Sequence, residues 1–522
     1  MTYVFHSPHP PLRIPDVSLP ELILSRADAC GPKVALIDPP SGRSITFAEF
    51  AGSVRGVAGS LSRIGFRKND VIALMSPNCP EYAVVFLAAA LLGGISTTLN
   101  PTSTRAEVKD QAEDSGARYL FTWPDLLDRA GDVRGWKAIL TRGAATGALA
   151  VDDLAGACGP AEPTPIDPSR DLVALPYSSG TTGTSKGVCL THRNLVANLH
   201  QTASSIFTGE DVILGLAPFF HIYGLTVVLH LGLLLGATDV VLPRFEIQSF
   251  VETVERYGVT HANLVPPLIL ALAKHPGIDP ARLSSLRTVQ SGAAPLAPDA
   301  AAAFSERFRC RVLQGYGLTE TSPVTHVAPR EREDIPIESV GPPVANTECR
   351  IRDVATGRTL GPGQRGELSV RGPQVMEGYF HAPEKTREML DEAGWLRTGD
   401  VAWADEQGNF YIVDRVKELI KYKAYPIAPA ELEAILLSHP RVDDAAVVPS
   451  PDTAAGEVPK AFVVARSDLD AGELMSWVAG RVAPYKKIRR IEFVDRIPRS
   501  ASGKILRRVL VERDRQTGGG RT

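Results

Sequence analysis

Apolar and polar residues alternate in short blocks along the first part of the chain. Apolar runs at Val34–Asp38 and Val71–Leu74 have the length and composition of strands. Thr46–Leu61 repeats apolar residues every three or four positions, and Glu81–Leu92 is apolar almost throughout, which predicts two helices. Alternating strands and helices predict a mostly parallel sheet with helices on both faces.

The same alternation continues to about Gly341, with one interruption. A helix is predicted from His192, and further strands at Ala117–Phe121, Ala138–Leu140, Leu172–Pro176, Val212–Leu216, Asp239–Leu242, Thr260–Leu264, Leu286–Val289 and Val312–Leu313. The interruption, Ala144–Asp171, is rich in Ala, Gly and Pro and lacks periodicity. We expect it to be an irregular surface connection.

The pattern changes after Gly341. Antiparallel strands with Gly and Pro turns are predicted at Cys349–Asp353, Gly366–Arg371 and Phe410–Val413, followed by a helix at Ala430–Leu437 and strands at Ala445–Val448 and Ala461–Val464. We therefore predict an α/β fold in two domains. Residues 1–414 form a large N-terminal domain of mixed, mostly parallel sheets flanked by helices, plus a β-rich subdomain. Residues 415–522 form a small, mobile C-terminal α+β domain.

Composition narrows the class of protein. The chain of 522 residues is 44% hydrophobic and 22% charged, which is ordinary for a globular protein. Its net charge of −3 argues against nucleic-acid binding through a general basic field. The six cysteines are scattered without a C-x-x-C pair, which favours a reduced, cytoplasmic setting over a disulfide framework or zinc site. We see no secretory signal, and Ala83–Ile95 is too short to span a membrane.

The segment Tyr177–Gly187 reads YSSGTTGTSKG and follows a predicted strand. Glycine N–H groups and Ser and Thr hydroxyls make a nest for anionic oxygens, and Lys186 adds a positive charge. A strand, a polar loop and then a helix is a common arrangement for holding phosphate. The order differs from a P-loop because Gly187 follows the lysine, and by composition alone the segment could be a flexible surface loop.

Two more predicted strands end in small and polar residues. Leu286–Val289 continues into QSGAAP, and Val312–Leu313 continues into QGYGLTE, which ends at Glu320. Open α/β sheets bind ligands at such strand ends, so we expect both segments to line a site.

Five motifs in order along the chain resemble those of the acyl-adenylate-forming enzymes. They are YSSGTTGTSKG (Tyr177–Gly187), QGYGLTE (Gln314–Glu320), TGD (Thr398–Asp400), DRVKELIKYK (Asp414–Lys423) and PRSASGKILRR (Pro498–Arg508). That superfamily contains acyl-CoA synthetases, firefly luciferase and the adenylation domains of peptide synthetases. The segments PFFHIYG and IKYK look most like the 4-coumarate–CoA ligase branch.

The resemblance implies roles for individual residues. Lys504, His221, Thr319 and Glu320 are the implied catalytic residues, and Glu320 holds Mg²⁺. ATP and AMP would be held by Ser178, Ser179, Gly180, Thr181, Thr182, Gly183, Thr184, Lys186, Ser291, Gly292, Ala293, Gln314, Gly315, Tyr316, Gly317, Thr319, Asp400, Arg415 and Lys421. The acid pocket would comprise His221, Tyr223, Val227, Gln290, Gly315, Gly317, Pro323 and Val324. Coenzyme A would meet Arg244, Lys423 and Ala424, with Lys417 as the hinge.

Outside these motifs, the same residue types would have ordinary structural roles. Lys504 would be a solvated lysine near a basic tail, His221 a satisfied core histidine, and Asp400 a charge after a turn-forming Thr-Gly pair. The five motifs together favour the catalytic and binding roles.

The chain departs from coumarate ligases in two places. Ala424 and Pro426 stand where those ligases have Gly and Gln, which puts thiolation in some doubt. In the acid pocket, Val227 replaces a small residue and Gln290 an apolar one, which suits a shorter, partly polar acid.

We therefore expect an ATP-dependent acid–thiol ligase that makes an aryl-CoA through an acyl-AMP, with ATP, Mg²⁺ and coenzyme A, as a monomer or homodimer. Two other enzymes remain open: a medium-chain fatty acyl-CoA synthetase and a stand-alone adenylation enzyme loading a carrier protein. Nothing in the sequence favours a luciferase-like oxygenase. A non-enzymatic nucleotide-binding protein is disfavoured because Lys504, Glu320 and Asp400 are all present.

Overall fold

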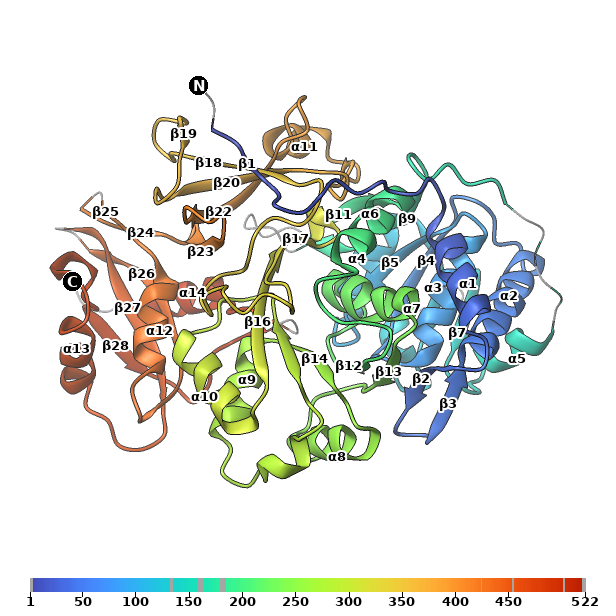
Figure 1. Cartoon of the computed structure of the whole chain (residues 1–522), viewed down its shortest axis with the longest axis horizontal. Coiled ribbons are helices and arrows are strands. Elements are labelled where there is room, and N and C mark those ends of the chain that lie inside the picture. The colour runs from blue at the N-terminus through green and yellow to red at the C-terminus, as the bar shows by residue number, and fades with distance from the viewer. Residues whose placement is uncertain are drawn as a thin grey trace.

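The computed structural model describes residues 3–131, 135–157, 159, 161, 164–178, 185–423, 425–452, 455–500 and 503–518. These residues form four sheets with helices packed on them. In Figure 1 the nine-stranded sheet lies at the right, mostly in blue and teal. The eight-stranded sheet lies in the middle, mostly in green and yellow, with its two strands from the start of the chain in dark blue at the lower right. The six-stranded sheet is at the top in orange, and the five-stranded C-terminal sheet is at the left.

Two large sheets make up most of the chain. The nine-stranded sheet runs β10 (Tyr177–Ser178), β11 (Lys186–Thr191), β9 (Leu172–Ala174), β5 (Ile95–Leu99), β4 (Val71–Met75), β6 (Ala117–Thr122), β7 (Ala138–Thr141) and β8 (Leu149–Ala150), with β21 (Gly378–Tyr379) beside β11. The eight-stranded sheet runs β17 (Val324–Val327), β16 (Arg311–Gly317), β15 (Thr288–Ser291), β14 (His261–Leu264), β12 (Val212–Gly215), β13 (Thr238–Val241), β2 (Val34–Asp38) and β3 (Arg43–Thr46). Its six central strands, β16 to β2, pair in parallel, as the alternating pattern predicts.

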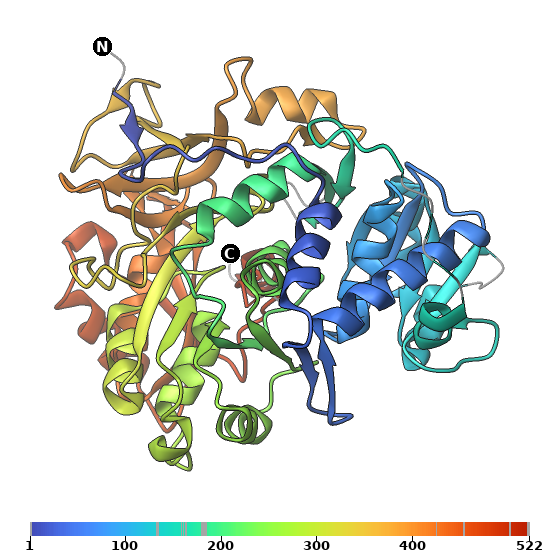
Figure 2. The ribbon, with the colours of Figure 1, turned by 45° about the vertical axis from the view of Figure 1, so that its right-hand side comes forward.

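Two smaller sheets are largely antiparallel. The six-stranded sheet runs β1 (Phe5–His6), β18 (Glu348–Arg352), β20 (Gly366–Arg371), β22 (Leu396–Ala404) and β23 (Phe410–Arg415), with β19 (Thr359–Leu360) beside β18. The five-stranded sheet runs β25 (Tyr425–Ile427), β24 (Ile420–Tyr422), β27 (Gly456–Ala465) and β26 (Val442–Asp452), with β28 (Arg490–Phe493) beside β27. The start of the chain pairs with β18 and then runs across to the helices of the nine-stranded sheet (Figure 2).

The helices in chain order are α1 (Leu19–Cys30), α2 (Phe47–Arg63), α3 (Pro80–Leu91), α4 (Arg105–Ser115), α5 (Val151–Ala157), α6 (His192–Thr202), the π-helix η3 (Tyr223–His230), α7 (Leu231–Leu235), α8 (Ile247–Tyr257), α9 (Pro266–Lys274), α10 (Pro298–Phe308), α11 (Pro383–Met389), α12 (Pro429–Leu437), α13 (Ala471–Ala479) and α14 (Arg507–Gly518). Short 3₁₀ turns are η1 (Pro124–Ala130), η4 (Pro280–Leu283), η5 (Thr319–Thr321) and η6 (Pro484–Lys486). No helix among the described residues is long and apolar enough to cross a membrane.

Helix α2 shows why the sequence pattern is reliable where a helix covers a sheet. Thr46 caps its first turn in a reciprocal box with Glu49, whose carboxylate accepts from the Thr46 N–H at 2.8 Å. Its apolar face, including Phe47, Phe50 and Val54, is fully buried. Helix α3 is buried along almost its whole length, which explains its apolar composition.

Two predictions about local structure are wrong and one is incomplete. Ala144–Asp171 is not wholly irregular, because it contains β8 and α5, and the Ala155 carbonyl would lie 2.0 Å from a Cβ built on Gly56. The predicted helix from His192 is confirmed as α6, but β10 and β11, which pair as an antiparallel hairpin, were not predicted between the preceding strand and that helix. Thr398–Asp400 lies within β22 rather than at a turn, and Gly399, with φ of +72°, lies next to an irregularity in the pairing.

Candidate active site

The loop that carries Lys504 packs against the start of α9. A Cβ built on Gly503 would lie 3.3 Å from Val265 Cγ2, and the φ of Gly503 is +81°. The Ser500 N–H donates to the Lys504 carbonyl at 2.8 Å, which closes the loop on itself. The sequence thus uses a left-handed glycine to bring the loop's backbone close to another part of the chain.

The Lys504 side chain lies among residues predicted to hold the nucleotide. Lys504 is an exposed residue, but protein around its ammonium partly desolvates that group and lowers its pKa. Arg415 lowers the pKa further, whereas Asp400 and Glu320 oppose the shift by attraction. The structure therefore brings Lys504, Asp400, Arg415 and Glu320 together, although they lie in four separate segments of the chain.

Asp400 and Arg415 face each other across β22 and β23. They are paired residues of the two strands, and the Arg415 Nε lies 3.4 Å from the Asp400 Oδ1. The Tyr316 hydroxyl donates to the Asp400 Oδ2 at 2.5 Å. Burial raises the pKa of Asp400, and attraction to Arg415 and the Tyr316 bond oppose that rise. The carboxylate is thus held in place from two sides.

Glu320 is held at the turn η5 by two hydroxyl groups. The Ser178 hydroxyl donates to its Oε1 at 3.0 Å, and the Tyr379 hydroxyl donates to the same atom at 2.8 Å. The Lys186 ammonium lies 5.5 Å from the centre of the Tyr379 ring. Among the described residues, both bonds use Oε1, so Oε2 is available to a hard cation and fits Mg²⁺.

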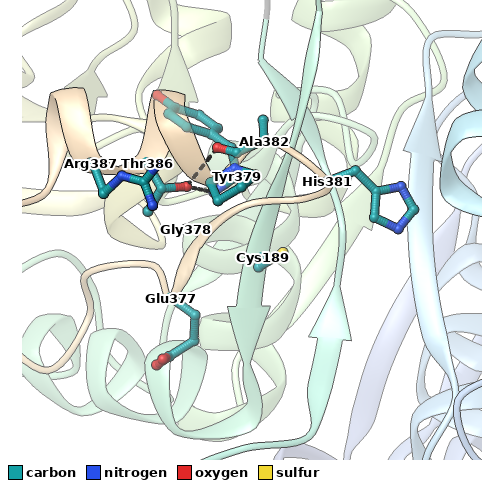
Figure 3. A pocket seen from close by; sticks show the side chains of 9 residues that line it. Cys189, Glu377, Gly378, Tyr379, His381, Ala382, Thr386 and Arg387 are labelled. Carbon is teal, nitrogen blue, oxygen red and sulfur yellow. Dashed lines mark hydrogen bonds between the residues drawn. The ribbon is translucent and has the colours of Figure 1, made fainter.

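Tyr379 is a residue that the sequence analysis missed. It lies on the short strand β21, beside β11, and its backbone N–H donates to the Thr386 hydroxyl at 2.9 Å. It lines a hollow of about 460 Å³ between β11, β21 and α11. Figure 3 shows it there together with Cys189 and Arg387. A tyrosine on an edge strand has no sequence signal that separates it from an ordinary surface aromatic.

Amide groups gather beside Tyr223. The Tyr223 hydroxyl lies 2.9 Å from the Asn263 Oδ1 and 3.2 Å from the Gln290 backbone carbonyl. Gln290 is 2% exposed, and neither its Oε1 nor its Nε2 has a hydrogen-bond partner in the described part of the chain; the Asn263 Nδ2 has none there either. A Cβ on Gly315 would lie 3.1 Å from the Gln290 Nε2. Buried amides without partners are unfavourable unless a ligand satisfies them.

His221 stays neutral next to this cluster. Burial lowers its pKa to about 3, and the positive charge of Lys504 adds to the shift. The Tyr223 N–H donates to the His221 Nδ1 at 3.2 Å, which assigns the ring proton to Nε2. His221 can therefore donate a hydrogen bond to a carboxylate but does not carry a charge at neutral pH.

The remaining nucleotide and pocket residues lie at the ends of parallel strands. Ser291 and Gln314 are paired residues of β15 and β16, which sets Gly292 and Ala293 next to the segment that leads to Thr319. Gly317 approaches Pro323 and Val324 closely, because a Cβ on Gly317 would lie 1.9 Å from the Pro323 carbonyl oxygen. Val227 is buried on η3 within the main core.

The predicted coenzyme A residues and the hinge have contacts of their own. Arg244 is exposed and pairs with Glu246 at 2.9 Å, and Lys417 is exposed after β23. The backbone N–H groups of Lys421 and Lys423 bond within the C-terminal sheet region, to the Glu457 carboxylate and the Ala455 carbonyl. Ser179, Gly180, Thr181, Thr182, Gly183, Thr184 and Ala424 lie outside the described residues.

Comparison with known proteins agrees with this geometry. Residues 25–380 match the AMP-binding enzyme family, and residues 431–504 match the AMP-binding enzyme C-terminal domain. The 4-coumarate–CoA ligase 3 of Oryza sativa subsp. japonica is 41% identical, covering 97% of this chain and 94% of that protein. The 4-coumarate–CoA ligase 1 of Petroselinum crispum is also 41% identical, covering 95% of each.

Solved structures show the same fold. The anthranilate CoA ligase AuaEII, in complex with anthranoyl-AMP, has a TM-score of 0.88 at 25% identity and covers 97% of this chain and 99% of its own. The benzoate CoA ligase from Burkholderia xenovorans LB400 has a TM-score of 0.86 at 26% identity and covers 95% of this chain and 100% of its own. On this evidence, the chain belongs to the family of AMP-binding enzymes that includes the 4-coumarate–CoA ligases.

Proposed function

We propose that the protein is an ATP-dependent acid–thiol ligase that converts an aromatic carboxylic acid to its acyl-CoA through an acyl-AMP, releasing AMP and pyrophosphate. The observation that carries this proposal is the convergence of Lys504, Glu320, Asp400 and Arg415 on one region. A cation for the reacting oxygens, a carboxylate for a metal and a buried carboxylate for the ribose are the parts that adenylation needs.

In the first step the substrate carboxylate attacks the α-phosphorus of ATP, and the bond from that phosphorus to the pyrophosphate oxygen breaks. Lys504 neutralises the carboxylate and the α-phosphate oxygens, while Lys186 and the loop before it hold the outer phosphates. Asp400 accepts hydrogen bonds from the ribose hydroxyls, and Arg415 fixes the position of the Asp400 carboxylate. Glu320 would hold Mg²⁺, which would supply charge neutralisation on the phosphate oxygens.

The second step requires the thiol to reach the adenylate. We propose that residues 415–522 rotate about Lys417 relative to residues 1–414, so that Lys423 and its neighbours replace Lys504 at the adenylate. The thiolate of coenzyme A then attacks the acyl carbon, and AMP leaves. Ala424 and Pro426 alter the segment that would line the path of the thiol. We therefore expect the rate of this second step to differ more from that of coumarate ligases than the rate of the first.

The amide cluster supports a short aryl acid with a ring substituent that forms hydrogen bonds. The buried Gln290 amide and the Asn263 Nδ2 offer both donors and an acceptor without partners in the described residues. A ring amino or hydroxy group can satisfy them, as in a 2-aminobenzoate, and an alkyl chain cannot. This argument disfavours a medium-chain fatty acid.

ATP–pyrophosphate exchange tests the first step, and chromatography of the CoA thioester tests the second. The panel is benzoate, 2-aminobenzoate, 4-coumarate and octanoate. We expect exchange and thioester formation with the aryl acids. Fastest exchange with octanoate would favour a fatty acyl-CoA synthetase instead. Exchange without any thioester from coenzyme A would favour a carrier protein as acceptor.

A further inference from the structure

The outer face of the six-stranded sheet carries a row of polar residues in register. Arg350 on β18 is paired with Ser369 on β20, and Ser369 is paired with Arg397 on β22. Arg352 lies two residues further along β18 and therefore on the same face. The opposite face carries buried apolar residues such as Ile351 and Leu368, so the arginine row is the side turned away from the core.

Helix α11 closes this face into a hollow of about 110 Å³. Arg387 and Glu388 of α11 line it together with the arginine row and Trp395. The guanidinium carbon of Arg350 lies 3.8 Å from the centre of the Trp395 ring. Stacking uses the flat face of a guanidinium and leaves its N–H edge free to bind something else.

Buried donors in the hollow have no partners. Ser369 is 2% exposed and Trp395 is 3% exposed. The Ser369 hydroxyl, the Trp395 indole N–H and the Arg350 Nε–H have no hydrogen-bond partner within the described parts of the chain. Unpaired buried polar groups are rare in folded proteins and call for an explanation such as a bound ion.

The hollow also carries an excess of positive charge. Among the residues that the structure describes, Arg350, Arg352 and Arg387 have no carboxylate within ion-pair distance, whereas Arg397 pairs with Glu367 at 2.7 Å. The acids that line the hollow are engaged elsewhere: Glu388 binds Lys385 at 2.7 Å, and the Asp391 Oδ1 accepts two backbone N–H groups. Gathering arginines without an anion is unfavourable.

We propose that this hollow is a binding site for a tetrahedral oxyanion of the phosphate class, either free phosphate or the phosphate group of a phosphomonoester. Arg350 and Arg387 supply charge, and Ser369 and Trp395 donate hydrogen bonds to its oxygens. Arginine is the cation suited to such oxygens, because its planar fork can donate two bonds at once. The site lies on β18, β20 and α11, and none of the residues that line it is among those predicted to hold ATP, the acid or coenzyme A.

Titration calorimetry with inorganic phosphate, at ionic strength matched with chloride, tests the site in the full chain. We expect at least tenfold weaker binding in Arg350→Gln and Arg387→Gln, and several-fold weaker binding in Ser369→Ala. Arg371→Gln is the matched control. Arg371 stacks on the same Trp395 ring at 4.8 Å, but it binds Glu348 at 2.7 Å and does not line the hollow.

Two further measurements separate the proposal from its alternatives. Without phosphate, Ser369→Ala should unfold at the same temperature as the wild type or higher, because it removes an unpaired buried hydroxyl. Phosphate binding that disappears in Lys186→Ala but persists in Arg350→Gln overturns the proposal, as does the absence of saturable binding to the wild type. Tighter binding of glycerol 3-phosphate than of phosphate identifies a phosphomonoester as the ligand, and the reverse identifies the free ion.

Discussion

The Tyr316 hydroxyl donates a hydrogen bond to the Asp400 carboxylate at 2.5 Å and so joins strand β16 to strand β22. These strands belong to different sheets. The bond fixes the carboxylate relative to the ends of the parallel strands, and Arg415 approaches the same carboxylate from β23. An acceptor fixed in this way is ready to bind ribose hydroxyls without reorganising.

Asp400→Ala should weaken ATP binding by at least about tenfold, because each hydrogen bond to a charged acceptor contributes about 1.5–3 kcal/mol. Titration calorimetry measures the change. Tyr316→Phe is the control, because it keeps the Asp400 charge and removes one hydrogen bond to that carboxylate. It should weaken ATP binding less than Asp400→Ala does. Unchanged ATP affinity in Asp400→Ala would mean that the carboxylate only stabilises the strand.

Lys504→Ala should abolish adenylate formation and leave thioester formation from synthetic acyl-AMP largely intact, because the proposed rotation removes Lys504 before the second step. Pyrophosphate release and thioester chromatography measure the two steps separately. Arg508→Ala is the control, because Arg508 lies on the following helix with a side chain that is 74% exposed. Equal loss of both steps in Lys504→Ala would contradict the division of labour.

The adenylation rate should fall at high pH, starting below the usual lysine range. Lys504 must be protonated to neutralise two anions, and its desolvation lowers its pKa from 10.5. Activity is therefore present below this lowered pKa and is lost as pH rises through it. The alkaline limb of kcat/KM for pyrophosphate release reports the free enzyme. A limb that stays flat to pH 10.5 would show that Lys504 is not the group that titrates.

Gln290→Met should shift acid preference away from 2-aminobenzoate and toward 4-coumarate, since the variant removes the buried amide that a ring amino group would satisfy. The ratio of kcat/KM for the two acids measures the change. Val227→Ala should move the ratio less, because a methylene contributes about 1–3 kcal/mol and an unpaired polar group can cost more. Preference of the wild type for coumarate, or an unmoved ratio in Gln290→Met, would contradict the pocket argument.

Asp239→Asn should stabilise the protein increasingly as pH rises from 5 to 8. Asp239 is buried on β13 without a side-chain partner among the described residues, and burial raises its pKa to about 8 from 3.8. Between these values the folded state keeps a proton that the unfolded state releases, so the wild type loses stability as pH rises, by about 1.4 kcal/mol per pH unit. Thermal unfolding of both proteins across this range checks the slope, and parallel curves would contradict it.

The sequence predicted the buried elements well and the irregular ones poorly. Val34–Asp38 is a strand with the predicted bounds, because its apolar residues pack into a core whose spacing is visible in the sequence. Helix α5 was missed because just two of its residues, Val151 and Leu154, are buried, too few to set a period. The hairpin β10–β11 was missed because β10 is two residues long, too short to show an alternation, although residues 188–191 of β11 carry a strand pattern.

The residues of the candidate site also divide into those that the sequence predicted and those that it missed. Lys504, Glu320 and Asp400 lie in recognisable motifs, and the structure brings them together. Asn263 was missed, although a polar residue inside the buried strand β14 is itself a signal. Tyr379 could not have been found, because its contact with Glu320 depends on how β21 joins β11.

The seat of Gly503 has a consequence for how readily the C-terminal segment can leave. At that seat it meets Val265 and Pro267 through its backbone, with no side chain of its own interlocked between them. A smooth contact of this kind separates without rotamer changes or repacking, and each atom pair lost contributes about 0.1–0.2 kcal/mol. For the proposed rotation, this contact would therefore break and re-form readily, whereas a side chain at this position would have to be withdrawn at each departure and reinserted at each return.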